Sequence, residues 1–109
     1  MCDERFFGLE KKRYETAGIN SELDIEYRLL LWQLVDELRD SEVEIDYLQV
    51  FEFSVDSVDG RKVQILEHRQ ECPDYKMVYQ FGEVENFVQA KIYVIDDGDH
   101  CTMLFASEY

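Results

Sequence analysis

The 109-residue sequence has little positive charge. Lys and Arg together number 11 against 25 Asp and Glu, which leaves a formal net charge of −14. Direct binding to nucleic acid requires a basic surface that neutralises phosphates, so this charge excludes a direct nucleic-acid binder. An anionic membrane surface would repel the chain for the same reason. We therefore expect a partner with a basic protein surface.

Long apolar runs are also missing. No stretch approaches the ~20 apolar residues that span a bilayer, and the charged first residues do not form the apolar region of a signal peptide. The three cysteines, Cys2, Cys72 and Cys101, are odd in number and widely spaced, which favours free thiols in a reducing compartment. These observations predict a cytoplasmic protein.

Proline and glycine are too scarce to form a linker that would divide the chain into domains. It has one proline, five glycines and no Ser/Gly/Pro linker, while 46% of its residues are hydrophobic and 14% are aromatic. Such a composition excludes a disordered acidic tail. We expect a lead-in segment at residues 1–12 and a single domain at residues 13–109.

One helix dominates the apolar patterning. Asn20 or Ser21 can cap it, and it is predicted to run from Glu22 to Arg39. Two adjacent apolar stripes follow helical spacing and predict a wide buried face; they consist of Leu23, Tyr27, Leu30, Leu34 and Leu38, and of Ile25, Leu29, Trp32 and Val35.

The remainder of the chain alternates with a period of two, which is typical of strands. Asp59-Gly60 predicts a hairpin. A two-residue loop would place Phe53 opposite Leu66 and Val55 opposite Gln64. A three-residue loop would place Val55 opposite Val63 and Phe53 opposite Ile65, and we predict this register because it keeps apolar residues on one face. The strand signals lie at residues 13–16, 45–55, 63–70, 77–82, 90–95 and 102–106.

This order of elements predicts the fold class. We expect an α+β domain in which one main N-terminal helix packs on a mainly antiparallel sheet of about five or six strands.

Metal sites are poorly supported by the spacing. Asp96, Asp97 and Asp99 beside His100 resemble calcium ligands, but the closing glutamate of a calcium loop is absent and a tight turn explains Asp-Gly. The residue types that bind zinc are also present, but they lack the Cys-x-x-Cys spacing of structural zinc sites; they are His68, Cys72, His100 and Cys101. We predict no metal and no other cofactor.

Catalytic motifs are equally weak. A cysteine nucleophile needs a histidine and an orienting carboxylate, and Cys72 with His68 or Cys101 with His100 meets only part of that requirement. No Gly-x-Ser-x-Gly motif and no Gly-rich phosphate loop occurs. We predict that the protein is not an enzyme, with a small cysteine-dependent enzyme as the least favoured alternative.

The acidic surplus is the strongest physical signal. Between Glu22 and Asp46 there are nine acidic residues against Arg28 and Arg39, a net charge of −7 and half of the total. Such a surface can serve solubility alone, or it can dock on a basic channel in a partner. The candidate partner-binding residues are Asp36, Glu37, Asp40, Glu42, Glu44, Asp46, Asp96, Asp97 and Asp99.

Several stretches together resemble a known family. They are residues 13–19 (RYETAGI), 31–36 (LWQLVD), 46–52 (DYLQVFE), 68–75 (HRQECPDY), 91–97 (KIYVIDD) and the closing residues 102–109. The chain resembles the uncharacterised family labelled domain of unknown function 960, found in Gram-positive bacteria and their phages. The resemblance covers residues 13–109 and supplies no catalytic residues.

The phage association of that family implies a function for the acidic charge. It implies a small acidic protein that inhibits a guide-RNA nuclease, similar to a type II-A anti-CRISPR, inside the bacterial host. Such nucleases hold nucleic acid in positively charged channels. The alternative is a cytoplasmic adaptor or regulatory module, and the sequence assigns neither its partner nor the oligomeric state.

Overall fold

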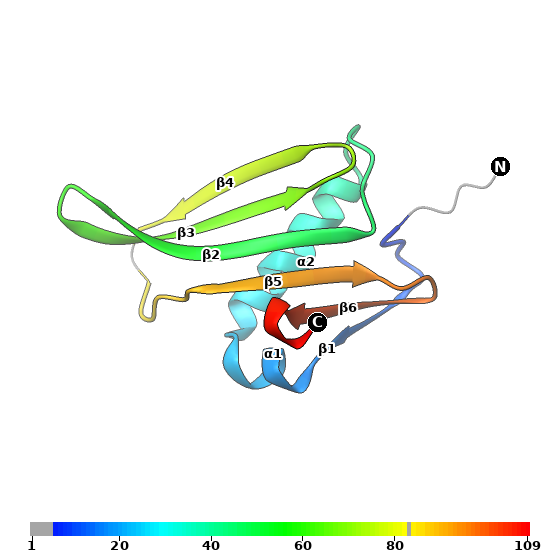
Figure 1. The fold of residues 1–109 in the computed structure, drawn as a ribbon, viewed down its shortest axis with the longest axis horizontal. Helices are drawn as coiled ribbons and strands as arrows, with labels where there is room; N and C mark the ends of the chain where they lie inside the picture. Colours follow the sequence, from blue (N-terminus) through cyan, green and yellow to red (C-terminus); the bar gives the residue numbers. More distant parts are fainter. Residues whose placement is uncertain (1–5, 83) are drawn as a thin grey trace.

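The computed structural model describes residues 6–82 and 84–109, which form a two-layer α+β fold (Figure 1). Helix α2 crosses one face of a six-stranded sheet. In chain order the elements are β1 (Lys12–Glu15), α1 (Ala17–Glu22), α2 (Ile25–Arg39), β2 (Leu48–Val58), β3 (Arg61–Gln70), β4 (Tyr75–Phe81), β5 (Ala90–Asp96), β6 (His100–Phe105) and the 3-10 helix η1 (Ala106–Glu108).

The sheet is mixed. Its strand order is β1-β6-β5-β2-β3-β4, and β1 pairs with β6 in parallel while the other neighbours are antiparallel. The predicted α+β class and the number of strands are confirmed, but the expected mainly antiparallel sheet is refined by this parallel edge. A four-residue strand of mixed polarity carries no signal for its direction, which explains why the sequence analysis missed the pairing.

The single predicted helix from Glu22 is wrong at its start. Residues Ala17–Glu22 form the separate helix α1, which is capped by Thr16 because its Oγ1 accepts a hydrogen bond from the amide of Ile19 at 3.2 Å. Leu23 then adopts an extended backbone, and its carbonyl accepts a hydrogen bond from Arg28 Nε at 2.9 Å. This break separates α1 from α2, which starts at Ile25.

The predicted register of the β2–β3 hairpin is also wrong. Val58 pairs with Arg61, so the loop contains two residues, Asp59 and Gly60 with φ of 53° and 79°. Positive φ at both central positions is the requirement of a type I′ turn. Val55 consequently lies opposite Gln64.

A buried amide explains the error in register. Gln64 faces the core, where its Nε2 donates to the carbonyls of Ser54 at 2.9 Å and Val88 at 2.8 Å, and its Oε1 accepts from the Val88 amide at 2.7 Å. Because all of these bonds are made inside the fold, a polar residue occupies a position that the apolar pattern assigned to valine.

The core lies between α2 and the facing side of the sheet. From the helix, Leu31, Val35 and Leu38 are buried, and the predicted burial of Trp32 and Leu34 is confirmed. Ile25 and Leu29 are 56% and 62% exposed, so the second predicted stripe is only partly buried. The sheet contributes the buried side chains of Phe51, Phe53, Leu66, Ile92, Val94 and Met103.

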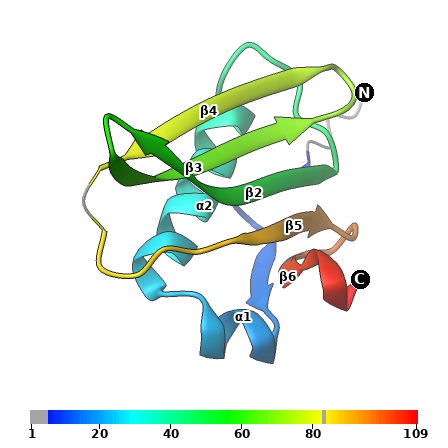
Figure 2. The same cartoon turned by 60° about the vertical axis from the view of Figure 1, so that its left-hand side comes forward.

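On the opposite side of the sheet, the β4 side chains Lys76, Val78 and Gln80 are exposed. In Figure 2 α2 lies behind the strands, while η1 and the C-terminus lie beside β5 and β6. Tyr109 contacts Tyr93 there, with ring centroids 5.6 Å apart. By strand alternation this face also carries Leu48, Val50, Ile95 and Leu104, of which Val50 and Ile95 are buried and the other two half-buried.

Candidate functional site

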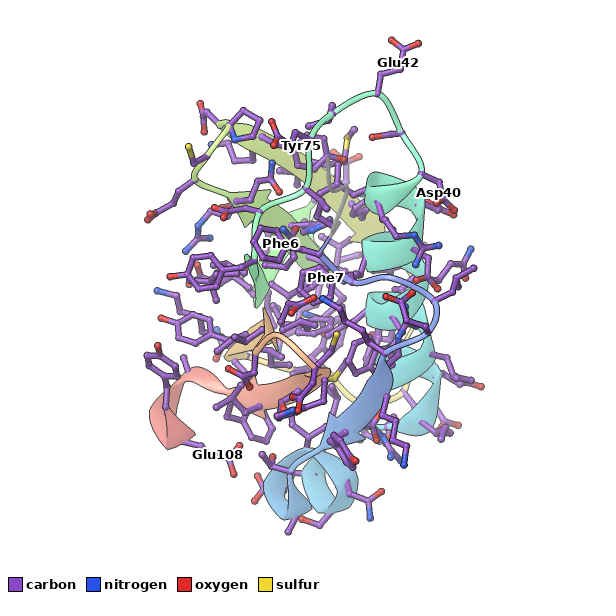
Figure 3. The ribbon with its side chains drawn as sticks, turned by 90° about the vertical axis from the view of Figure 1, so that its right-hand side faces the viewer. Phe6, Phe7, Asp40, Glu42, Tyr75 and Glu108 are labelled. Carbon is purple, nitrogen blue, oxygen red and sulfur yellow. The ribbon has the colours of Figure 1, made fainter. Side chains whose placement is uncertain are left out.

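Several acidic loops and turns lie together at one end of the molecule. Figure 3 faces this end, where α2 finishes and where four segments meet: 6–11, 40–47, 71–74 and 97–99. They carry nine carboxylates and one lysine, a net charge of −8. We call this surface the acidic end; its carboxylates are Glu10, Asp40, Glu42, Glu44, Asp46, Glu71, Asp74, Asp97 and Asp99.

A buried amide holds two of these segments together. Gln70 is 2% exposed, and its Oε1 accepts hydrogen bonds at 2.8 Å from the Asp46 amide and from Gln49 Nε2. Its Nε2 donates at 2.9 Å to the carbonyls of Glu44 and Pro73. The backbone of segment 40–47 is therefore fixed to the β3–β4 turn by a side chain with all of its hydrogen-bonding capacity used.

The amide network extends to a buried histidine. His68 is 1% exposed, stacks on Phe51 with centroids 4.3 Å apart, and its Nε2 lies 2.7 Å from Gln49 Oε1. Burial lowers the pKa of His68 from 6.5 to about 4, so the imidazole is neutral at physiological pH. The sequence analysis missed Gln49 and Gln70, although polar residues at inward-facing strand positions were the available signal.

Asp96 joins the other two segments of the acidic end. Its carboxylate accepts hydrogen bonds from the amides of Phe7 at 2.7 Å and Gly98 at 2.8 Å, and it forms an ion pair with Lys11 at 2.7 Å. Its own amide donates to the carbonyl of Tyr47 at 2.9 Å. Burial alone would raise the pKa of Asp96, but the bonds from Lys11, Phe7 and Gly98 outweigh it and hold that pKa below its ordinary value.

The structure divides the predicted partner-binding residues into two groups. Asp96 is buried and therefore does not reach a partner, which corrects its place in the predicted surface. Asp36 forms ion pairs with Arg13 and Arg39 at the seam between β1 and α2. The Asp46 carboxylate accepts hydrogen bonds from the amides of Tyr47 and Cys72, so it has a structural role.

The other predicted residues remain at the surface. Asp40 pairs with Arg39 at 2.9 Å yet its side chain is 66% exposed, and Glu37 accepts a hydrogen bond from Gln33 on α2. Asp97 and Asp99 flank His100 at 3.4 and 2.7 Å from its ring nitrogens. Glu42 and Glu44 are exposed, and Figure 3 shows Glu42 projecting from the tip of its loop. Most of the predicted residues are thus brought to one end of the fold.

The described cysteines and histidines do not converge on one site, and Cys2 lies outside the described residues. Across residues 6–82 and 84–109, no group of three or more His, Cys, Asp or Glu side chains is arranged to hold a metal ion. Cys72 is exposed, whereas Cys101 is buried with its Sγ 3.9 Å from Asp96. Burial, together with the Asp96 charge, raises the pKa of the Cys101 thiol from 9.0 to about 11. This environment disfavours the thiolate that a nucleophile requires.

Within the described residues, no helix combines the length and the apolar character needed to cross a membrane.

Comparisons with known proteins place the fold. The chain matches, over residues 12–108, the model of a family described as "Staphylococcal protein of unknown function (DUF960)". A crystal structure of a protein of unknown function from Enterococcus faecalis is similar, with a TM-score of 0.75, 22% sequence identity, and coverage of 99% of this chain and 98% of that one. No curated protein matches the chain. On the family match over almost its whole length, this protein belongs to the DUF960 family.

Proposed function

We propose that this protein is a non-enzymatic interaction protein whose acidic end docks on a basic surface of a partner. The observation that carries the proposal is the charge of −8 gathered by four separate segments at one end of the fold. Scattered carboxylates would serve solubility equally well, but a concentrated field steers a basic partner to one orientation.

The structure of the acidic end supports recognition. Docking costs less free energy when the contact surface is ordered before the partner arrives. Gln70 fixes segment 40–47 to segment 71–74, and Asp96 fixes segment 6–11 to segments 40–47 and 97–99. The carboxylates are thus carried by loops whose backbones are hydrogen-bonded to buried side chains.

Within this proposal, the target class is a guide-RNA nuclease and the protein is its inhibitor. These nucleases hold nucleic acid in positively charged channels and recognise it mainly through its backbone. A rigid surface with closely spaced carboxylates offers the same sign of charge as that backbone. The proposal rests on this match of charge and on the phage association that the family resemblance implies.

The test is a DNA-cleavage assay of a guide-loaded type II nuclease with three forms of the protein. One variant reverses the acidic end through Glu42→Lys, Glu44→Lys and Glu71→Lys, a shift of six charge units. The matched control makes the same shift at the far end through Glu22→Lys, Glu26→Lys and Glu85→Lys. All six residues are exposed, so each change should alter stability by about 0.5 kcal/mol or less.

We expect the parent and the far-end control to inhibit cleavage and the acidic-end variant to lose inhibition. Inhibition by the parent should weaken as salt rises, because screening shortens the reach of the field. Equal inhibition by a folded acidic-end variant would show that these carboxylates only solvate the surface.

A second candidate function is an adaptor, and the exposed part of the sheet face opposite α2 favours it. On that face the β4 side chains Lys76, Val78 and Gln80 offer a second surface that is independent of the acidic end. Binding of a basic protein by the acidic end without inhibition of any nuclease would favour this adaptor function.

A further inference from the structure

Two aromatic side chains lie exposed within the acidic end. Phe6 is 40% exposed and Tyr47 is 47% exposed, and their ring centroids are 6.2 Å apart at an interplanar angle of 59°. Figure 3 shows Phe6 near the middle of this end, with Asp40 and Glu42 toward its rim. An aromatic centre with a charged rim is the usual anatomy of a recognition surface.

The exposure of Phe6 follows from an unusual backbone at its neighbour. Phe7 has a φ of 62°, which a bulky residue rarely adopts, and its side chain is fully buried. Its amide donates to Asp96 at 2.7 Å and its carbonyl accepts from Arg39 at 2.9 Å. The buried side chain and both hydrogen bonds fix the chain so that Phe6 remains at the surface.

The backbone of Tyr47 is also held by the buried residue Asp96. Its carbonyl accepts a hydrogen bond from the Asp96 amide at 2.9 Å, and its amide donates to the carboxylate of Asp46 at 2.8 Å. Asp96 therefore holds both sides of the pair. Its backbone amide binds the carbonyl of Tyr47, and its carboxylate binds the amide of Phe7 next to Phe6. Two exposed rings are ordered in advance, which lowers the entropy cost of binding.

We propose that the Phe6–Tyr47 pair is the docking point for an arginine side chain of the basic partner. This inference rests on the proposed function and specifies the partner's chemistry. A guanidinium is planar, weakly hydrated and stacks on aromatic faces, whereas the lysine ammonium is compact and strongly hydrated. Exposed carboxylates in the segments that carry the pair, such as Glu42 and Glu44, complement its charge. The acidic end should therefore select arginine over lysine.

The test compares an oligoarginine peptide with an oligolysine peptide of equal length, using the full chain and fluorescence anisotropy. We expect the parent to bind oligoarginine about fivefold more tightly. The variant Phe6→Leu/Tyr47→Leu keeps apolar bulk and every carboxylate but removes both rings. It should bind the two peptides with nearly equal affinity.

A control variant changes exposed aromatic residues outside the acidic end, through Phe87→Leu/Tyr109→Leu, and should keep the preference for arginine. A melting curve establishes that the double variant is folded, and the two single variants replace it if it is not.

The outcomes separate the two proposals. Equal affinities of the parent for both peptides, or a preference that survives loss of both rings, would overturn the arginine site and leave the acidic docking surface intact. If neither peptide binds the parent, the acidic end does not recognise basic chains and the proposed function fails as well.

Discussion

Replacement of Gln70 by leucine tests whether buried amides hold the acidic end in place. The change removes four hydrogen bonds of 2.8–2.9 Å at nearly constant side-chain volume. Each such bond contributes about 1 kcal/mol net. Water can reach part of the loop after the change, so we expect Gln70→Leu to lower the free energy of unfolding by about 2–4 kcal/mol.

Urea unfolding followed by circular dichroism measures this change, and hydrogen exchange locates it. The amides of Asp46 and Cys72 should exchange faster in Gln70→Leu, because the Asp46 amide loses its acceptor and the Asp46 carboxylate, which accepts from Cys72, loses its fixed position. Gln80→Leu is the matched control on exposed β4 and should change stability by about 0.5 kcal/mol or less. A loss below about 1 kcal/mol in Gln70→Leu, with both amides equally protected, would refute the role of the network.

Three further changes follow from the same structure. The pKa of His68 is about 4 in the fold against 6.5 when unfolded, so between these pH values the unfolded state binds a proton that the folded state does not. The free energy of unfolding should therefore fall by up to about 3 kcal/mol as the pH is lowered from 6.5 to 4. Urea titrations at several pH values measure this slope, and His68→Phe should flatten it. Trp32→Ala and Leu34→Ala should each cost about 2–5 kcal/mol by lost burial and cavity formation, and melting like the parent would contradict their place in the core. Neither calcium nor zinc at about ten times the protein concentration should raise the melting temperature, and an increase reversed by chelator would reveal a site that binds the folded state.

The fold was predictable where apolar spacing alone determines the structure. The helical period identified α2 through Trp32 and Leu34, and strand alternation identified the sheet. Prediction failed where polar groups decide the outcome. Gln64 is buried by hydrogen bonds and sets the β2–β3 register. Thr16 caps a separate α1 at residues where the sequence analysis placed only the cap and the first residue of a single helix.

The candidate site was predictable in composition but not in arrangement. The charge density between Glu22 and Asp46 indicated an acidic surface. Its convergence with residues 71–74 and 97–99 depends on strand order, which local patterns do not encode. The sequence analysis assigned Asp96 to that surface because Asp-Asp-Gly-Asp is typical of an exposed turn, whereas long-range bonds to Phe7 and Lys11 hold it in the interior. Phe6 and Tyr47 are far apart in sequence, so their contact had no sequence signal.

The most direct test of the docking claim is the association rate with a guide-loaded type II nuclease, measured for the parent and for both charge-reversal variants. The two triple variants have the same net charge and differ only in where it is changed. We predict that the far-end variant associates like the parent, while the acidic-end variant associates at least tenfold more slowly, roughly the size of a lost electrostatic steering effect. Equal slowing of both variants would contradict the account, because total charge and not the acidic end would then control association.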